Sequence, residues 1–130
     1  MTTEEYKKIS RAYRRDVEHH IQVRCVNWFR SKYDDILIFA IPNGGDRNLL
    51  TAKKLKAEGV LKGVADLFVL YPNGEYAGLF IEMKTKDGRQ QESQKEFQKY
   101  CEKVGYRYVV CRNEEEFEKE VEGYIENEIG

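Results

Sequence analysis

Three charged residues stand at the ends of two neighbouring apolar runs of the chain. Asp66 directly precedes the run 67–70, and Glu82 and Lys84 close the run that begins at Leu79. Side chains alternate across a strand, so Glu82 and Lys84 share one face. A turn at Asn73-Gly74 would fold the two runs into a hairpin and set Asp66 roughly opposite Glu82 or a neighbouring position.

This arrangement is suited to metal-dependent cleavage of a phosphodiester. Two facing carboxylates, Asp66 and Glu82, could hold one hard cation such as Mg²⁺ or Mn²⁺, which would polarise a phosphate. Lys84 would orient the attacking water or neutralise charge that develops on the phosphate. The alternative is a surface Glu-Lys pair with an aspartate near a turn. A second Glu-x-Lys, Glu5-Tyr6-Lys7, lies on a polar segment without a strand pattern, so the strand context gives the motif its meaning.

Two predicted helices carry further candidates for this site. Gln94 lies one turn before Phe97, on the core-facing side of a helix that follows the Glu82-x-Lys84 run, where an amide needs a polar partner. Glu18 and Gln22 border the apolar stripe of the first long helix at positions i and i+4. Either could join the site, or both could lie on a solvated helix edge.

The pattern of apolar residues predicts an α/β domain. Expected helices cover 3–13, 15–33, 48–58 and 90–104, with a last one capped by Asn113; expected strands cover 36–41, 64–71, 76–84 and 106–111. The segment 3–13 is expected to be a short extra helix before the first long one. Without it, the order of the elements is α-β-α-β-β-α-β-α. A mixed four-stranded sheet flanked by helices follows from this order.

Length and composition are those of a single globular domain over residues 1–130. No run of 18 apolar residues and no secretory signal is present, so we expect a cytoplasmic protein with no membrane partner. Three widely spaced cysteines without a C-x-x-C pair indicate buried free thiols rather than zinc ligands.

The net charge of -1 conceals an asymmetry, so the overall charge does not exclude a polyanionic partner that binds a local basic face. Residues 1–63 carry 13 Lys/Arg against 8 Asp/Glu, and residues 64–130 carry 9 against 15. Candidate DNA-contacting residues surround a Gly-rich loop and flank Lys84, with a second cluster nearer the N-terminus; they are Arg47, Lys53, Lys54, Lys56, Lys62, Lys86, Arg89, Arg11, Arg14 and Arg15. The alternative is solubilising charge. The Glu-rich last helix is not expected to face DNA; its apolar stripe would be core or a dimer contact.

These motifs together resemble the VRR-Nuc domain of the PD-(D/E)xK nuclease superfamily, which has a restriction-endonuclease-like fold. The resemblance rests on Glu18, Gln22, Ile41-Pro42-Asn43-Gly44, Gly63-Val64-Ala65-Asp66-Leu67, Ile81-Glu82-Met83-Lys84, Gln94, Phe97 and Gly105. It implies DNA cleavage that depends on Mg²⁺ or Mn²⁺. Asp66, Glu82 and the backbone carbonyl of Met83 would be metal ligands, supported by Glu18; Lys84 would be the catalytic lysine, and Gln94 would organise the site. Ala65 replaces the proline of the superfamily, which shapes the backbone and binds nothing.

A chain of one bare domain is similar to stand-alone, virus-encoded members that resemble Holliday junction resolvases. That similarity implies a homodimer which cuts branched DNA in the host cell, with no small-molecule cofactor. Two alternatives from other classes remain open. One is a catalytically inactive nucleic-acid-binding module of the same fold, and the other is a structural α/β interaction protein.

Overall fold

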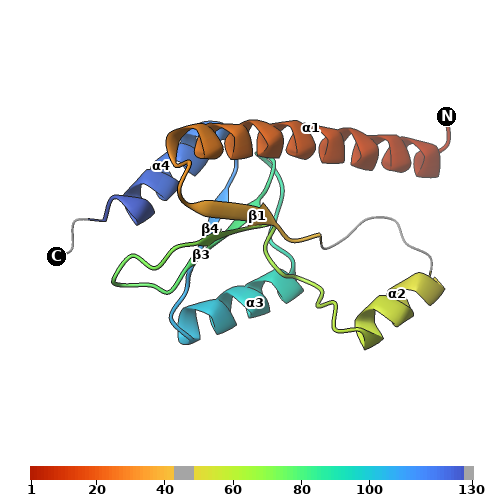
Figure 1. Cartoon of the computed structure of the whole chain (residues 1–130). Helices are drawn as coiled ribbons and strands as arrows, with labels where there is room; N and C mark the ends of the chain where they lie inside the picture. The colour runs from red at the N-terminus through yellow and green to blue at the C-terminus, as the bar shows by residue number, and fades with distance from the viewer. Residues whose placement is uncertain (43–48, 128–130) are drawn as a thin grey trace.

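The computed structural model describes residues 1–42 and 49–127, with the backbone alone at Leu49 (Figure 1). Its elements are α1 (Thr3–Lys32), β1 (Leu37–Ala40), α2 (Leu49–Ala57), β2 (Leu67–Leu70), β3 (Leu79–Met83), α3 (Glu92–Lys103), β4 (Arg107–Cys111) and α4 (Glu114–Ile125). The predicted α/β class and the order of strands and helices are confirmed. Each strand is shorter than predicted, because apolar residues continue past the ends of the backbone ladder.

The four strands form one mixed sheet in the order β1-β2-β3-β4. The β1–β2 and β2–β3 pairs are antiparallel, and the β3–β4 pair is parallel, with α3 as the crossover. In the connection that follows β2, Asn73 accepts hydrogen bonds from the backbone of Glu75 and Tyr76, as expected of an Asx turn. The predicted hairpin at Asn73-Gly74 is therefore confirmed.

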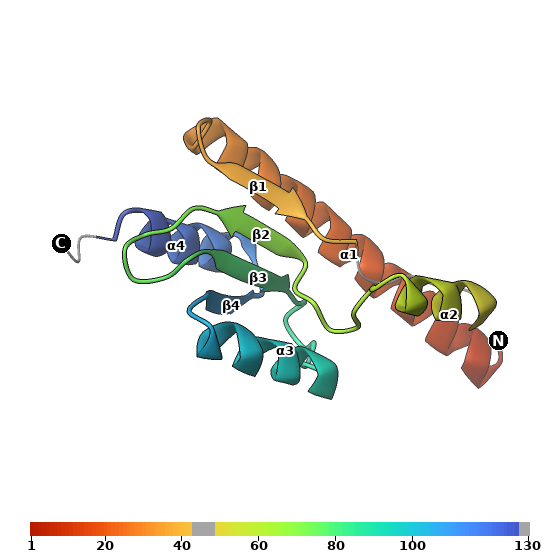
Figure 2. The same cartoon turned by 60° about the horizontal axis from the view of Figure 1, so that its bottom comes forward.

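Helices cover the sheet on both faces (Figures 1 and 2). The main core lies between the sheet and the pair α1 and α4, where Phe29, Ile81 and Phe117 are fully buried. A smaller core lies beneath α3 and contains Cys101 and Tyr108. Residues of β3 alternate between these two cores, so Ile81 faces one core and Glu82 faces the other.

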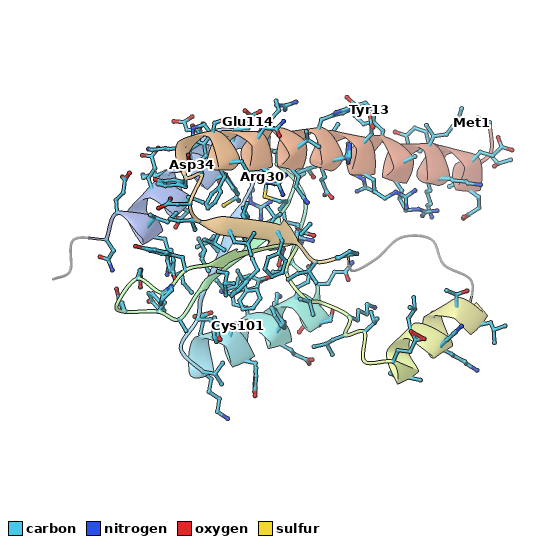
Figure 3. The ribbon with its side chains drawn as sticks, in the orientation of Figure 1. Met1, Tyr13, Arg30, Asp34, Cys101 and Glu114 are labelled. Carbon is cyan, nitrogen blue, oxygen red and sulfur yellow. The ribbon has the colours of Figure 1, made fainter. Side chains whose placement is uncertain are left out.

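Helix α1 is one continuous helix of 30 residues, not the two helices predicted for 3–13 and 15–33. Thr2 caps it in a capping box with Glu5, so the helix begins at the N-terminal segment. The apolar stripe fades before residue 15, but no Gly or Pro lies between residues 3 and 32 to break the helix. The first turns of α1 consequently extend beyond the sheet. Tyr13 lies on this part and Met1 just before it, whereas Arg30 and Asp34 lie near the opposite end of α1 (Figure 3).

Two further predictions agree with the packing. Asn113 caps α4 by accepting a hydrogen bond from the Glu116 amide, and the apolar stripe of α4 is buried against α1 and β4, so it belongs to the core. The three cysteines are buried free thiols, and burial raises the pKa of the Cys25 and Cys111 thiols to about 12. Across residues 1–42 and 49–127, no helix is both long enough and apolar enough to cross a bilayer.

Candidate active site

The predicted charged residues gather at the end of the sheet where β2 begins and β3 ends. Leu67 pairs with Ile81, so continuing the antiparallel register by one residue places Asp66 opposite Glu82. Lys84 follows β3 and is held by a 3.0 Å hydrogen bond from its amide to the carbonyl of Cys111. The hairpin therefore brings Asp66, Glu82 and Lys84 to one end of the sheet, as the turn and the alternation of side chains predict.

Asp66 is a partly buried carboxylate with one of its oxygens already bonded. Its Oδ2 accepts a hydrogen bond of 2.6 Å from the amide of Met83. Burial raises the pKa of Asp66 from its ordinary 3.8 to about 6, despite the opposing effect of the Met83 amide. The nearby charges of Glu82 and Glu18 contribute to this rise in pKa, and Lys84 opposes it. A carboxyl group with a strongly shifted pKa at the edge of a cleft is a candidate functional-site residue.

Glu82 is the one charged residue that is buried in the part of the chain the structure describes, with 1% of its surface exposed. Its Oε1 accepts hydrogen bonds from the hydroxyl of Tyr108 and from Nε2 of Gln90, the latter at 3.2 Å. Its Oε2 is also buried, but no hydrogen-bond donor among the described residues reaches it. Nζ of Lys84 lies 3.6 Å from this second oxygen. Glu82 thus has one oxygen that accepts two hydrogen bonds and one that accepts none from the described residues but is paired with Lys84.

Lys84 is 13% exposed and lies between the buried Glu82 and the loop 85–88. Arg112, just after β4, fixes that loop. Its NH1 donates to the carbonyls of Thr85 at 2.8 Å, Lys86 at 3.3 Å and Gly88 at 2.7 Å. One guanidinium group thereby holds the chain segment that follows the lysine, which restricts where the base of the Lys84 side chain can lie.

An open cleft of about 690 Å³ borders these residues on the α1 side. Glu18 and Gln22 of α1 line it together with Asp66 and Met83. The predicted residues on α1 therefore do face the site end of the sheet, and they are not on a fully solvated helix edge. Glu82 and Lys84 do not line this cleft, because they lie on the α3 side of the sheet. Asp66 nevertheless interacts electrostatically with Glu82 and Lys84 as well as with Glu18.

Gly63 fixes the approach of the chain to Asp66. Its φ is +95°, which favours glycine, and a Cβ atom added there would lie 2.5 Å from the backbone oxygen of Ser93 in α3. The loop before β2 can therefore press against the first turn of α3 only with a glycine at this position. This packing holds the chain that leads into Asp66 against the first turn of α3.

Gln94 lies at the start of α3, but its side chain serves the helix terminus. Its Oε1 accepts a 2.7 Å hydrogen bond from the backbone amide of Gln91, as part of a capping box. The expected contact with the end of the Glu82 strand is instead made by Gln90, which precedes the helix. The predicted helix began at residue 90, whereas α3 begins at Glu92, and this offset moves Gln94 into the capping position.

Sequence reasoning missed three residues at this site: Tyr108, Gln90 and Arg112. One signal for Tyr108 was available, since a tyrosine within an apolar strand needs a hydrogen-bond partner for its hydroxyl when it is buried. Burial, and then the hydrogen bond to Glu82, raise the pKa of Tyr108, so its hydroxyl stays protonated and remains a donor. Gln90 and Arg112 contact the site from loops, for which periodicity gives no signal.

The basic residues predicted to contact DNA lie around the same end of the sheet. Lys53, Lys54 and Lys56 are exposed on α2, Lys62 follows it, and Lys86 and Arg89 are exposed beside Lys84. Helix α2 and the first turns of α1 both project beyond this end of the sheet (Figures 1 and 2). Arg47 lies outside the described residues.

The donor set at this site fits a hard divalent cation. Within residues 1–42 and 49–127, no three His, Cys, Asp or Glu side chains stand close enough together to enclose a metal ion. Two carboxylates and a backbone carbonyl nevertheless suit Mg²⁺, which binds few protein oxygens and keeps several waters. The Oε2 atom of Glu82 is buried, has no hydrogen-bond donor among the described residues and has Lys84 as an ion-pair partner at 3.6 Å, so it can still accept a bond from a cation.

Comparisons with known proteins agree with this architecture. The profile of the VRR-NUC domain matches residues 3–115. A solved structure described as a VRR_NUC domain protein superposes with a TM-score of 0.70 at 27% sequence identity, over 84% of this chain and 88% of that chain. A search of curated proteins finds no match. Because the profile covers most of its length, the chain belongs to the VRR-NUC family of nuclease-type domains.

Proposed function

We propose that this protein is an endodeoxyribonuclease that hydrolyses phosphodiester bonds with the help of Mg²⁺ or Mn²⁺. The observation that carries the proposal is the buried carboxylate of Glu82. One of its oxygens lacks a donor among the described residues and lies 3.6 Å from Nζ of Lys84. A buried charge in this state is costly, and a bound cation would offset the cost.

Three groups would hold the cation: the carboxylates of Asp66 and Glu82 and the backbone carbonyl of Met83. Glu18 faces the same cleft as Asp66 and would support the ion from α1. A divalent cation at this position supplies Lewis acidity to the scissile phosphate. Lys84 would offset the charge that develops on the phosphate as water attacks, and Gln94 would stabilise the first turn of α3, on which Gln90 depends.

The partner proposed for this site is duplex DNA that reaches it between two basic projections. We define the α1 extension as residues 3–14, which precede the first residue that lines the cleft. It carries exposed Lys7, Arg11 and Arg14, whereas α2 carries Lys53 and Lys54. Both project from the end of the sheet that carries Asp66 (Figure 2). Cations on two sides of a cleavage site would hold phosphates without reading bases, which suits recognition of DNA shape.

A homodimer acting on four-way junctions remains part of the proposal. Leu37, Phe39 and Leu70 are 57%, 40% and 55% exposed, and they share the face of the β1–β2 pair that α3 leaves open. An apolar patch at the β1 edge of the sheet could pack against the same patch of a second copy about a two-fold axis, which is the geometry of most homodimers. Light scattering should report a dimer for the wild type and a monomer for Leu70→Glu; a wild-type monomer would contradict the dimer.

A cleavage assay tests the catalytic proposal. Wild-type protein and the variants Glu82→Gln, Lys84→Ala and Lys119→Ala are incubated with linear, flap and four-way DNA in Mg²⁺ or Mn²⁺. We expect at least about a 100-fold loss of rate for the first two variants. Lys119 is exposed on α4, so its variant should cut at the wild-type rate. Junction binding without cleavage in either metal would instead support an inactive DNA-binding module.

A further inference from the structure

The two oxygens of Glu82 have different surroundings, and Tyr108 is the main cause. We infer that Tyr108, assisted by Gln90, is a positioning residue that binds Oε1 of Glu82 and thereby reserves Oε2 for the cation and Lys84. This inference rests on the proposed function, because it assigns a role within the same site. Neither Tyr108 nor Gln90 was identified from the sequence.

Tyr108 is a donor that cannot easily move away. It is 4% exposed in β4, and its ring packs against Phe97 of α3 at a centroid distance of 6.1 Å. Its hydroxyl donates to Oε1 of Glu82. The parallel register pairs Glu82 with Val110 and Phe80 with Tyr108, so the hydroxyl approaches the carboxylate from the neighbouring strand on the same face. Packing on α3 therefore fixes the direction from which Oε1 is bonded.

Gln90 adds a second donor to the same oxygen. Its Nε2 lies 3.2 Å from Oε1 of Glu82 and 2.8 Å from Oε1 of Gln98, so the amide is held by α3 while it donates to the carboxylate. Two donors on one oxygen set the rotation of the carboxylate about its terminal bond. The other oxygen, Oε2, is left towards Lys84 at 3.6 Å.

Loss of the Tyr108 hydroxyl should release this constraint. The Glu82 carboxylate could then rotate and form a closer ion pair with Lys84. That ion pair would compete with the cation for Oε2 of Glu82. Outer partners that orient metal ligands commonly affect affinity by about 10-fold to 100-fold when removed. We therefore expect Tyr108→Phe to weaken Mn²⁺ binding by about 10-fold or more.

The experiment compares Tyr108→Phe with Tyr124→Phe. Tyr124 is a matched control, because it is also buried and its hydroxyl donates to a carbonyl, that of Tyr71, at 2.7 Å. It lies in α4 on the opposite face of the sheet, away from Glu82. Calorimetry without DNA measures Mn²⁺ affinity, urea unfolding measures stability, and steady-state cleavage measures kcat and KM. We expect Tyr108→Phe alone to lose Mn²⁺ affinity and kcat, with KM for DNA unchanged.

Three outcomes are informative. If Tyr108→Phe binds Mn²⁺ and cuts DNA as the wild type does, while losing as much stability as Tyr124→Phe, the hydroxyl is merely structural and the inference is wrong. If Tyr108→Phe is unfolded, the variant Gln90→Leu is tested in its place. A loss of Mn²⁺ affinity in Gln90→Leu, smaller than that expected for Tyr108→Phe, would support the inference, and wild-type affinity would overturn it. Failure of the proposed function looks different, because the wild type itself would then neither bind Mn²⁺ nor cut DNA.

Discussion

Replacing Asp66 with asparagine should stabilise the metal-free protein at neutral pH while it abolishes cleavage. Asparagine keeps a carbonyl oxygen that can accept the hydrogen bond from the Met83 amide, which Asp66 accepts at 2.6 Å. It removes the negative charge that burial and the charges of Glu82 and Glu18 disfavour. The substitution therefore separates the electrostatic cost of the carboxylate from its structural hydrogen bond.

The size of the effect follows from the pKa of Asp66. A pKa of about 6 in the folded protein, against an ordinary 3.8, corresponds to about 3 kcal/mol. Because the folded-state pKa is the higher of the two, the stability that Asp66 contributes is fully present below pH 3.8 and is lost as the pH rises to about 6. The advantage of Asp66→Asn should thus be about 3 kcal/mol at pH 8 and less than about 1 kcal/mol at pH 4.

Urea unfolding in EDTA at several pH values between 4 and 8 measures this difference. Asp66→Ala is the matched comparison, since it removes the acceptor of the Met83 amide as well as the charge, and it should gain less stability than Asp66→Asn. Added Mg²⁺ should stabilise the wild type but not Asp66→Asn, because a ligand stabilises only the state that binds it. A loss of stability in Asp66→Asn at pH 8, or a difference that does not vary with pH, would refute the reasoning.

Three further predictions concern the surroundings of the site. Gly63→Ala should lower the free energy of unfolding, measured in urea, by more than Gly59→Ala does. Both glycines have positive φ, but of these two only Gly63 would bring its new Cβ atom close to other described atoms. Equal losses would exclude the close packing as the cause. Arg112→Ala should speed hydrogen exchange of the amides in the loop 85–88 and slow cleavage, because the loop loses three hydrogen bonds; unchanged exchange would contradict this role. Lys53→Ala combined with Lys54→Ala should weaken binding to all DNA sequences alike and reduce the salt dependence of binding, measured by fluorescence anisotropy; an unaltered salt dependence would remove α2 from the DNA-binding surface.

Local signals were sufficient to predict the hairpin of the site. The turn about Asn73-Gly74 predicts that β2 and β3 pair with Asp66 near Glu82, and alternation along β3 then predicts that Ile81 and Glu82 lie on opposite faces. The positions of Asp66 and Glu82 follow from residues that are close together in the sequence. For the same reason the capping of α4 by Asn113 could be predicted correctly.

Long-range packing decides what the sequence could not show. The donors to Glu82 come from β4 and from the loop before α3, and no turn sets the parallel register of β3 and β4. A two-residue offset in the start of α3 was enough to place Gln94 in the capping box and to leave the contact with Glu82 to Gln90, for which no role was predicted. The length of α1 was also missed, because apolar periodicity reports burial, and its first turns are exposed.

Because β3 pairs in parallel with β4, the residues of the site are synthesised well before the residues that orient them. Asp66, Glu82 and Lys84 are all made before residue 85, but the groups that orient them, Tyr108 and Arg112, lie beyond the crossover helix. Contacts across such a crossover form late, since the intervening chain must first be ordered. An unfinished chain would therefore carry Asp66, Glu82 and Lys84 without the groups that orient them, and the proposed capacity to cut DNA would arise only when the last strand joins the sheet.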